Sequence, residues 1–276
     1  GSLASPQSGS SIARRTMADS ATSSSSCGFT PSRIASKHVS GSSRRRTTPA
    51  GAASSSVSLR PPRPVRKTPR SVKARISHSF ATPTLAVVDG KTQVMAPGPD
   101  HFAAYDLSTG EELWRVLAPG WSVVPQPTIG HGLVIYNHDY DNPELIAIKL
   151  GGKGDVTESN VVWRMKRGAP STPSPLLVGD ELYFVSDDGI ASCVDAKTGE
   201  RHWMERLGGN FSASPVLANG RVLFMNESGL ATWVKLGKKF ESLGTCEVPG
   251  RTFATPAFYD GAMFLRTDEK LYRISQ

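Results

Sequence analysis

A proline that recurs at nearly constant spacing constrains this chain more than any other feature of its sequence. From residue 80 onward, a short segment that first reads Phe80-Ala-Thr-Pro83 returns four times with small variations. The marker prolines are Pro83, Pro127, Pro175, Pro215 and Pro256, and the intervals between them are 44, 48, 40 and 41 residues. A period of this length is the size of one four-stranded β-propeller blade.

Each repeat also contains signals of short strands joined by hairpins. An apolar run follows the marker proline and ends at two residues that tolerate a positive φ, after which a second strand begins. These turn pairs are Asp89-Gly90, Gly179-Asp180, Asn219-Gly220 and Asp260-Gly261. No segment of a dozen residues shows helical periodicity, so the sequence predicts an all-β domain over 80–276. We expect a partial propeller of about four full blades and a partial fifth, at 80–117, 121–167, 170–208, 211–249 and 252–276.

The third turn of a blade carries the most specific motif. It reads Ala104-Tyr-Asp106-Leu-Ser-Thr109-Gly110-Glu-Glu-Leu-Trp114 and returns as Cys193-Val-Asp195-Ala-Lys-Thr198-Gly199-Glu-Arg-His-Trp203. In such a turn the Asp accepts a backbone N–H, the Gly supplies a left-handed conformation, and the Trp begins packing on the outer strand.

These two motif copies resemble the signature A-x-D-x-x-T-G-x-x-x-W of the PQQ-like (pyrroloquinoline-quinone-type) repeat propellers. The resemblance implies that the Trp of one blade docks against the Gly-containing turn of a neighbour. It assigns a structural, blade-docking role to Asp106, Thr109, Gly110, Trp114, Asp195, Thr198, Gly199 and Trp203. Two blades depart from the signature. The second lacks the Asp and carries an insert from Gly151 to Asn160 before Trp163, for which we expect a longer loop, and the fourth has no T-G turn.

The first 79 residues differ sharply in composition from the rest. They contain 14 Lys/Arg and one acid, Asp19, which gives +13, whereas the remaining 197 residues contain 18 basic and 23 acidic side chains, which gives −5. A segment so rich in Ser and Arg, and so poor in large apolar residues, is predicted to be disordered. Three origins stay open: a transit-like segment, a basic arm for nucleic acid or anionic lipid, or out-of-frame translation of GC-rich DNA. No signal peptide and no transmembrane segment are visible, and nucleic-acid binding is not expected of the acidic folded part.

The family contains both enzymes and scaffolds, and the sequence favours a scaffold. The resemblance extends to quinoprotein dehydrogenases, which use PQQ with calcium, and to bacterial outer-membrane assembly lipoproteins, which present loops and blade edges to partner proteins. Adjacent cysteines and a haem motif, which many of the dehydrogenases carry, are absent from this sequence. We therefore expect no catalytic, cofactor-binding or metal residues, and interpret Asp139-Tyr-Asp141-Asn142-Pro-Glu144 as a solvated acidic turn. The alternative is a fragment of a PQQ-dependent alcohol or sugar dehydrogenase whose cofactor site lies in upstream blades.

One set of residues is a candidate binding surface. In propellers, the loops that enter the innermost strands lie near the axis on one face. The candidate axial-face residues are Trp121, Arg167, Asn210, Phe211 and Arg251. Aromatic and Arg side chains suit protein or carbohydrate recognition, and the competing interpretation is packing between blades. The resemblance implies a periplasmic or extracytoplasmic location. A disulfide between Cys193 and Cys246 stays open, because spacing alone does not decide it.

Overall fold

The computed structural model describes residues 77–275, so the disorder predicted for the N-terminal segment concerns residues that lie almost wholly outside this description. The last residues of that segment belong to the folded part, because β1 (His78–Ser79) pairs in parallel with β6 (Ser122–Val123). His78 and Ser79, which the sequence analysis placed in the N-terminal segment, therefore pair with the loop that precedes blade 2.

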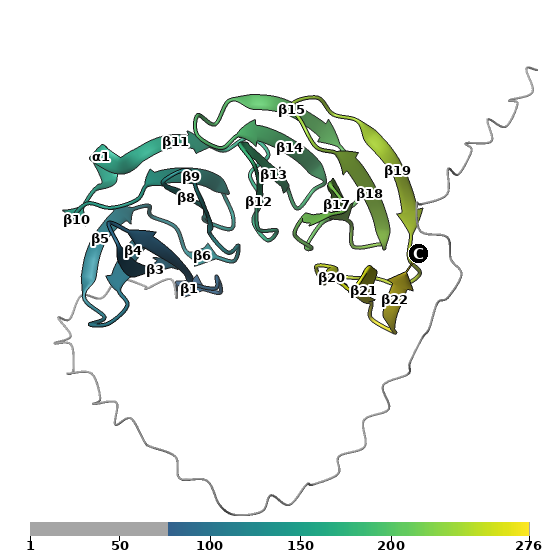
Figure 1. Ribbon diagram of the computed structural model, residues 1–276, viewed down its shortest axis with the longest axis horizontal. Coiled ribbons are helices and arrows are strands. Elements are labelled where there is room, and N and C mark those ends of the chain that lie inside the picture. The colour runs from purple at the N-terminus through teal and green to yellow at the C-terminus, as the bar shows by residue number, and fades with distance from the viewer. Residues whose placement is uncertain (1–76, 276) are drawn as a thin grey trace, which may run out of the picture.

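The fold consists of sheets that follow one another along an arc (Figure 1), and the predicted partial propeller is confirmed. Four sheets have four or more strands, and the last described sheet has three.

Blade 1 contains β2 (Thr84–Val88), β3 (Lys91–Pro97), β4 (His101–Asp106) and β5 (Glu112–Leu117). Blade 2 contains β7 (Thr128–Gly130), β8 (Leu133–His138), β9 (Glu144–Lys149) and β11 (Val161–Met165). Blade 3 contains β12 (Leu176–Val178), β13 (Glu181–Val185), β14 (Ile190–Asp195) and β15 (Arg201–Arg206). Blade 4 contains β16 (Val216–Ala218), β17 (Arg221–Met225), β18 (Leu230–Lys235) and β19 (Ser242–Glu247). Blade 5 contains β20 (Ala257–Tyr259), β21 (Ala262–Arg266) and β22 (Leu271–Ser275).

Each blade is an antiparallel meander whose first hairpin has the expected turn chemistry. The non-Gly residues Asp89, Asn219 and Asp260 have φ values of 49°, 50° and 48°, and the glycine that follows each of them also has a positive φ. Two consecutive positive φ values match the twist of the flanking strands in a two-residue hairpin. Blade 2 makes the same turn with His131-Gly132, which the sequence analysis did not identify because His is an uncommon residue there.

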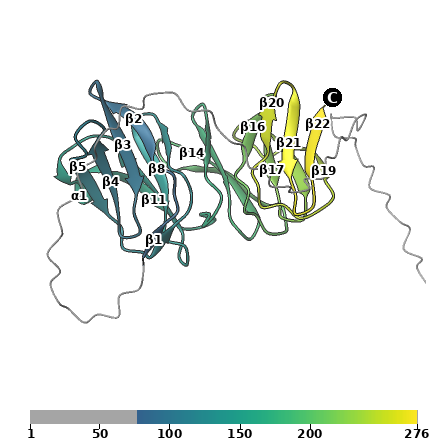
Figure 2. The same cartoon turned by 90° about the horizontal axis from the view of Figure 1, so that it is seen from below.

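The hydrophobic core is divided into four parts, one between each pair of successive blades. The middle strands are apolar on both faces for this reason: every residue of β8 is buried, and so are four of the five residues of β13. Such strands read as continuous apolar runs rather than as an alternating pattern, because each lies between two neighbouring sheets. In the edge-on view of Figure 2, blade 1 and blade 5 lie at opposite ends of the arc.

The insert of blade 2 is ordered and packs on blade 1, which corrects the expectation of a longer loop. It forms β10 (Gly154–Asp155), which pairs in parallel with the outer strand β5, and α1 (Thr157–Asn160). Val156 joins the core between blades 1 and 2, beside Trp114. The insert therefore covers an outer sheet edge that would otherwise leave its backbone groups unpaired.

The cysteine question is answered for Cys193. Its thiol is free and buried, so no disulfide joins it to Cys246. Burial raises the pKa of the Cys193 thiol to about 12. A thiol of this kind is a small core residue rather than a nucleophile.

Candidate functional site: the loop face of the propeller

The meander of each blade determines which residues share a face. The loop that enters the innermost strand and the turn between the second and third strands lie at the same end of an antiparallel sheet. We call the surface formed by these loops and turns the loop face. Its entering loops are 118–127, 166–175, 207–215 and 248–256, and its turns are 98–100, 139–143, 186–189, 226–229 and 267–270. The T-G turns of the family motif lie on the opposite face.

Tryptophan side chains dock on the T-G turn of a neighbouring blade, as the resemblance implied. One of them is Trp163, to which the sequence analysis assigned no docking role. A Cβ built on Gly199 would lie 2.9 Å from Cδ2 of Trp163, so the indole of blade 2 packs directly on the T-G turn of blade 3. The Trp163 Nε1–H donates to the Ala196 carbonyl in that turn at 3.1 Å. Trp203 repeats the contact one blade further, donating to the Gly237 carbonyl at 3.1 Å. Trp163 could have been found from its spacing between Trp114 and Trp203, although its blade lacks the rest of the motif.

The first motif copy behaves differently. Gly110 has a φ of 73°, as Gly199 does, yet a Cβ there would meet nothing within 4 Å. Trp114 is fully buried and donates its Nε1–H to Oε1 of Gln93 in its own blade at 3.1 Å. Among the described residues, the Gly110 turn therefore carries no docked indole.

The Asp and Thr residues of the two motif copies form their own turns. Asp106 Oδ1 accepts the backbone N–H of Ser108 at 2.8 Å, the Ser108 hydroxyl at 2.5 Å and the Thr109 N–H at 2.9 Å. Asp195 Oδ1 likewise accepts the backbone N–H groups of Lys197 and Thr198, both at 2.9 Å. Thr109 and Thr198 each accept the N–H two residues further on at 3.2 Å. The Oδ1 atoms of these carboxylates stabilise their own turns.

These hydrogen bonds set the titration of Asp106. The Ser108 hydroxyl, followed by the backbone N–H groups of Thr109 and Ser108, lowers the pKa of Asp106 to about 2 from a usual value of 3.8. Because the pKa of Asp106 is lower in the folded than in the unfolded protein, its ionised carboxylate stabilises the fold at pH values above the pKa of the unfolded state. This stabilisation is lost as the pH falls through about 2. We expect Ser108→Ala to raise the pKa of Asp106, because it removes the largest cause of the shift. Carboxyl-carbon NMR titration measures this, with Asp195 as the internal control, and an unchanged midpoint for Asp106 would contradict the assignment.

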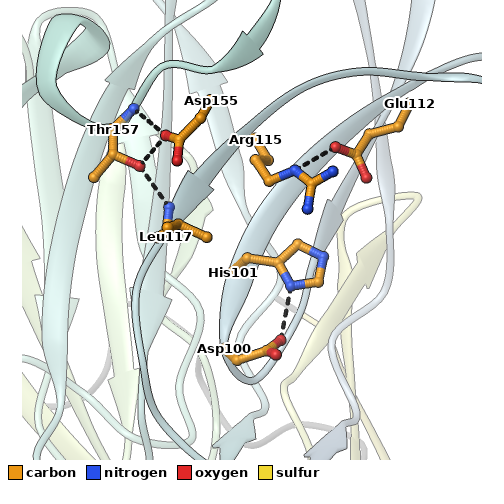
Figure 3. Close-up of polar contacts among 7 residues, drawn as sticks. All are labelled: Asp100, His101, Glu112, Arg115, Leu117, Asp155 and Thr157. Atoms are coloured by element: carbon orange, nitrogen blue, oxygen red, sulfur yellow. Dashed lines mark hydrogen bonds and ion pairs between the residues drawn. The ribbon is translucent and has the colours of Figure 1, made fainter. Parts of the chain in front are cut away.

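Polar groups of blade 1 and of the insert that packs on it also form local contacts (Figure 3). Asp155 accepts the Thr157 N–H at 3.0 Å and its hydroxyl at 2.6 Å, and Thr157 Oγ1 in turn accepts the Leu117 N–H at 2.8 Å. This chain of bonds fastens the insert to the end of β5. Nearby, an ion pair joins Arg115 to Glu112 at 2.6 Å, and a hydrogen bond joins His101 Nδ1 to an Asp100 carboxylate oxygen at 2.7 Å.

On the loop face, the residues before four of the five marker prolines link neighbouring blades. The Gln126 N–H donates to the Ser174 hydroxyl at 2.9 Å, the Ser174 N–H to the Ser214 hydroxyl at 2.9 Å, and the Ser214 N–H to the Thr255 hydroxyl at 3.0 Å. This ladder explains why Ser or Thr recurs before the proline, a regularity that the sequence showed without its reason.

A second repeated contact joins the entering loops of blades 3, 4 and 5 to the turns beside them. Asp187 Oδ2 accepts the backbone N–H groups of Ser171 and Thr172 at 2.6 and 3.3 Å. Glu227 accepts the Ser212 hydroxyl at 2.6 Å, and Asp268 accepts the Arg251 N–H at 3.1 Å. In these three blades, an acidic residue that follows the second strand thus holds the entering loop, and a loop ordered before binding loses less conformational freedom when it binds.

Four of the five candidate axial-face residues lie at the surface of the loop face. Arg167, Asn210 and Arg251 are exposed, and Trp121 is half-buried. Trp121 donates its Nε1–H to Asp141 Oδ2 at 2.9 Å and meets Tyr140 edge-on, with ring centroids 6.0 Å apart. The Arg251 guanidinium lies over the Phe253 ring, 5.3 Å from its centroid.

The prediction for Phe211 is wrong. Its side chain is 2% exposed and packs in the core between blades 3 and 4. Phe253, which was not among the candidates, is 57% exposed. Phe211 stands four residues before its marker proline and Phe253 stands three, and side chains alternate between faces along an extended segment. A shift of one position therefore sends the two phenylalanines to opposite sides.

The loop face exposes further aromatic side chains that the sequence analysis missed. Phe80, three residues before its proline, is 67% exposed and stacks on His78 with ring centroids 5.7 Å apart. Tyr140 is 42% exposed, and the Ser171 hydroxyl donates to its carbonyl at 2.9 Å. Within residues 77–275, no three His, Cys, Asp or Glu side chains are grouped so that they could hold a metal ion. No helix in the same range has the length and apolar character that a membrane crossing requires.

Comparisons with known proteins agree with this geometry. The sequence profile of the family described as "Outer membrane protein assembly factor BamB" matches residues 44–238 and 152–275, which together span most of the chain. The crystal structure of BamB from Moraxella catarrhalis superposes with a TM-score of 0.54 at 16% identity, covering 73% of this chain and 61% of that one. The computationally designed protein Ika8 superposes with a TM-score of 0.54 at 12% identity, covering 70% and 57%. The chain thus spans about three fifths of the length of these two structures, and no curated protein matches it by sequence.

Proposed function

Because the chain belongs to the PQQ-like repeat family described as outer membrane protein assembly factor BamB, we propose that it is a non-enzymatic scaffold whose loop face binds partner proteins. The observation that carries this proposal is a set of exposed aromatic side chains on the loops and turns of one face. Phe80, Tyr140 and Phe253 come from three different blades and lie on one face. Aromatic and Arg side chains that are already ordered before binding are typical anchors of protein interfaces.

The family description also supports the kind of partner and the compartment. A scaffold in outer-membrane assembly works outside the cytoplasm on other proteins, and we propose both properties for this chain. Carbohydrate is the second class of ligand that exposed aromatic rings suit.

The runner-up is a PQQ-dependent dehydrogenase fragment, with PQQ and calcium as its cofactors. The described carboxylates that could serve it, Asp106, Asp187 and Asp195, accept backbone N–H groups of their own loops and turns. A calcium site made of clustered carboxylates needs several of them directed at one point, and within residues 77–275 no three His, Cys, Asp or Glu side chains are grouped in this way. The dehydrogenase reading places its cofactor site in upstream blades.

Site-directed photo-cross-linking tests the loop face as a protein-binding surface. A photoreactive phenylalanine analogue would be placed at Tyr140 or Phe253 in the full chain and irradiated in the expressing cell. The matched control is Tyr259, which is 77% exposed but lies beside the first hairpin turn of blade 5, on the opposite face. We expect the same discrete protein adduct from positions 140 and 253 and none from position 259. Equal adducts from all three positions, or adducts from position 259 alone, would contradict the proposal.

A further inference from the structure

Two thioethers and one guanidinium meet at the seam between blades 2 and 3. The Arg201 guanidinium donates to Sδ of Met204 at 3.1 Å, to Sδ of Met165 at 3.0 Å and to the Arg167 carbonyl. The pairing of β14 with β15 skips His202, and this bulge brings Arg201 and Met204 to the same side of the sheet although they stand three positions apart. A thioether sulfur is only a weak hydrogen-bond acceptor, so two donors of this cation are poorly satisfied.

The surroundings of Met204 also contain buried donors that lack an acceptor. Ser192 is paired with Met204 across β14 and β15, is 0% exposed, and its hydroxyl has no hydrogen-bond partner among the described residues. Nε of Arg201 is likewise buried without a partner in that part of the chain. A Cβ built on Gly168 would lie 3.5 Å from Oγ of Ser192 and 3.7 Å from Sδ of Met204, so the hydroxyl and the sulfur lie under the same point of the entering loop. An acceptor atom added to this sulfur would therefore lie near donors whose burial without a partner destabilises the fold.

The Met204 side chain is more accessible than most methionines of the described chain. Met165 and Met204 are half-buried, whereas Met95 and Met225 are 0% exposed and Met263 is 4% exposed. A peroxide in solution must reach the sulfur to react with it, so the half-buried thioethers are the reactive ones.

We propose that Met204 is a modification site, which a hydroperoxide oxidises to the sulfoxide, and that the sulfoxide oxygen accepts hydrogen bonds from Arg201 and Ser192. A lone pair of the sulfur attacks one peroxide oxygen, so the S–O bond forms while the O–O bond breaks. The proton of the attacked O–H group passes to the leaving oxygen, which departs as water when the oxidant is hydrogen peroxide. The sulfur loses two electrons and the peroxide gains them, so no further reactant is needed.

Oxidation at this position strengthens the seam, which is the opposite of its usual effect. A sulfoxide in a core is normally disruptive because a polar group replaces an apolar one. Beside Met204, the new oxygen accepts a charge-assisted bond from the guanidinium, which is stronger than the contact with the sulfur, and satisfies the Ser192 hydroxyl. Arg201 lies on blade 3 and bonds the carbonyl of Arg167, which follows the last strand of blade 2, so a better-held Arg201 fastens the two blades together. The inference does not depend on the function proposed above.

Peroxide treatment of the full chain provides the test. Hydrogen peroxide would be added to the folded protein, mass spectrometry of its peptides would give the oxygen uptake at each methionine, and circular dichroism would follow thermal unfolding. We expect Met204 to be oxidised several-fold faster than Met95, Met225 and Met263, and the Tm to rise by about 2–4 °C. Methionine sulfoxide reductases specific for the two epimers should together return the Tm to its starting value.

Three variants assign the effect to its residues. Met204→Leu conserves the side-chain volume and should abolish the rise in Tm, whereas Met165→Leu should retain it. Met17→Leu should also retain the rise, and it controls for a methionine that lies outside the described residues. Ser192→Ala removes a hydroxyl without a partner in the described chain, so it should change the Tm of the unoxidised protein little but reduce the rise on oxidation.

Several results would overturn the inference. A fall in Tm on oxidation would mean that the sulfoxide disrupts the seam as it does an ordinary core. A rise that persists in Met204→Leu, or that is undiminished in Ser192→Ala, would mean that the effect arises elsewhere or without the hydroxyl. Oxidation of Met204 no faster than that of the three buried methionines would mean that its sulfur is not accessible to the peroxide.

Discussion

Replacing Gly199 with alanine is expected to lower the free energy of unfolding by about 2–5 kcal/mol, whereas the same change at Gly110 is expected to cost about 1–2 kcal/mol. The two glycines share a φ of 73° and stand in the same motif, so the cost of a left-handed alanine is common to both. Only at Gly199 would the new Cβ also meet the Trp163 indole, with three ring atoms at 2.9, 3.0 and 3.2 Å. The difference between the two variants therefore measures the docking of Trp163 on the next blade.

Equilibrium unfolding in guanidinium chloride measures both variants, provided that the transition is two-state. A third variant, Gly199→Ala combined with Trp163→Phe, makes room for the new methyl group and should recover part of the loss. Equal decreases in the free energy of unfolding for the Gly110 and Gly199 variants would show that the Trp163 indole moves aside without destabilising the fold. The docking contact would then contribute little to the association of the blades.

Replacing Phe211 with alanine is expected to destabilise the protein by about 3–5 kcal/mol, the usual cost of removing a buried aromatic ring. The matched change, Phe253→Ala, should shift stability by no more than about 0.5 kcal/mol, because that ring is exposed. If the loop face binds a protein, Phe253→Ala should weaken that binding although it leaves the stability of the fold unchanged.

Thermal unfolding followed by circular dichroism distinguishes the two outcomes. The prediction is a clear fall in Tm for Phe211→Ala and an unchanged Tm for Phe253→Ala. A small effect at Phe211 would contradict the prediction and would mean that the core between blades 3 and 4 adjusts to the loss of the ring.

The sequence predicted the features that depend on local spacing. Blade lengths follow from the marker prolines, and the hairpins follow from pairs such as Asp89-Gly90 and Asn219-Gly220, whose positive φ values are a property of those residue types. The T-G turns could be predicted equally well, because the Asp carboxylate accepts hydrogen bonds from residues only two or three positions away.

Features that depend on contacts between blades could not be predicted in the same way. The insert after β9 folds back on β5 of the preceding blade, through Thr157 and Leu117, which are 40 residues apart. Trp163 docks on the turn of blade 3 although its own blade lacks the motif. The separation of Phe211 from Phe253 depends on a one-residue offset within similar segments, which decides the side of an extended chain on which each ring lies.

The central claim, that this propeller binds partners rather than catalyses a quinone-dependent oxidation, is tested most directly by cofactor titration of the full chain. PQQ would be added with and without calcium, and reduction of an electron-acceptor dye would be followed with a panel of alcohols and sugars. The scaffold account predicts no saturable quinone binding and no dye reduction under either condition. Saturable binding with calcium-dependent dye reduction would contradict it and would establish the dehydrogenase reading.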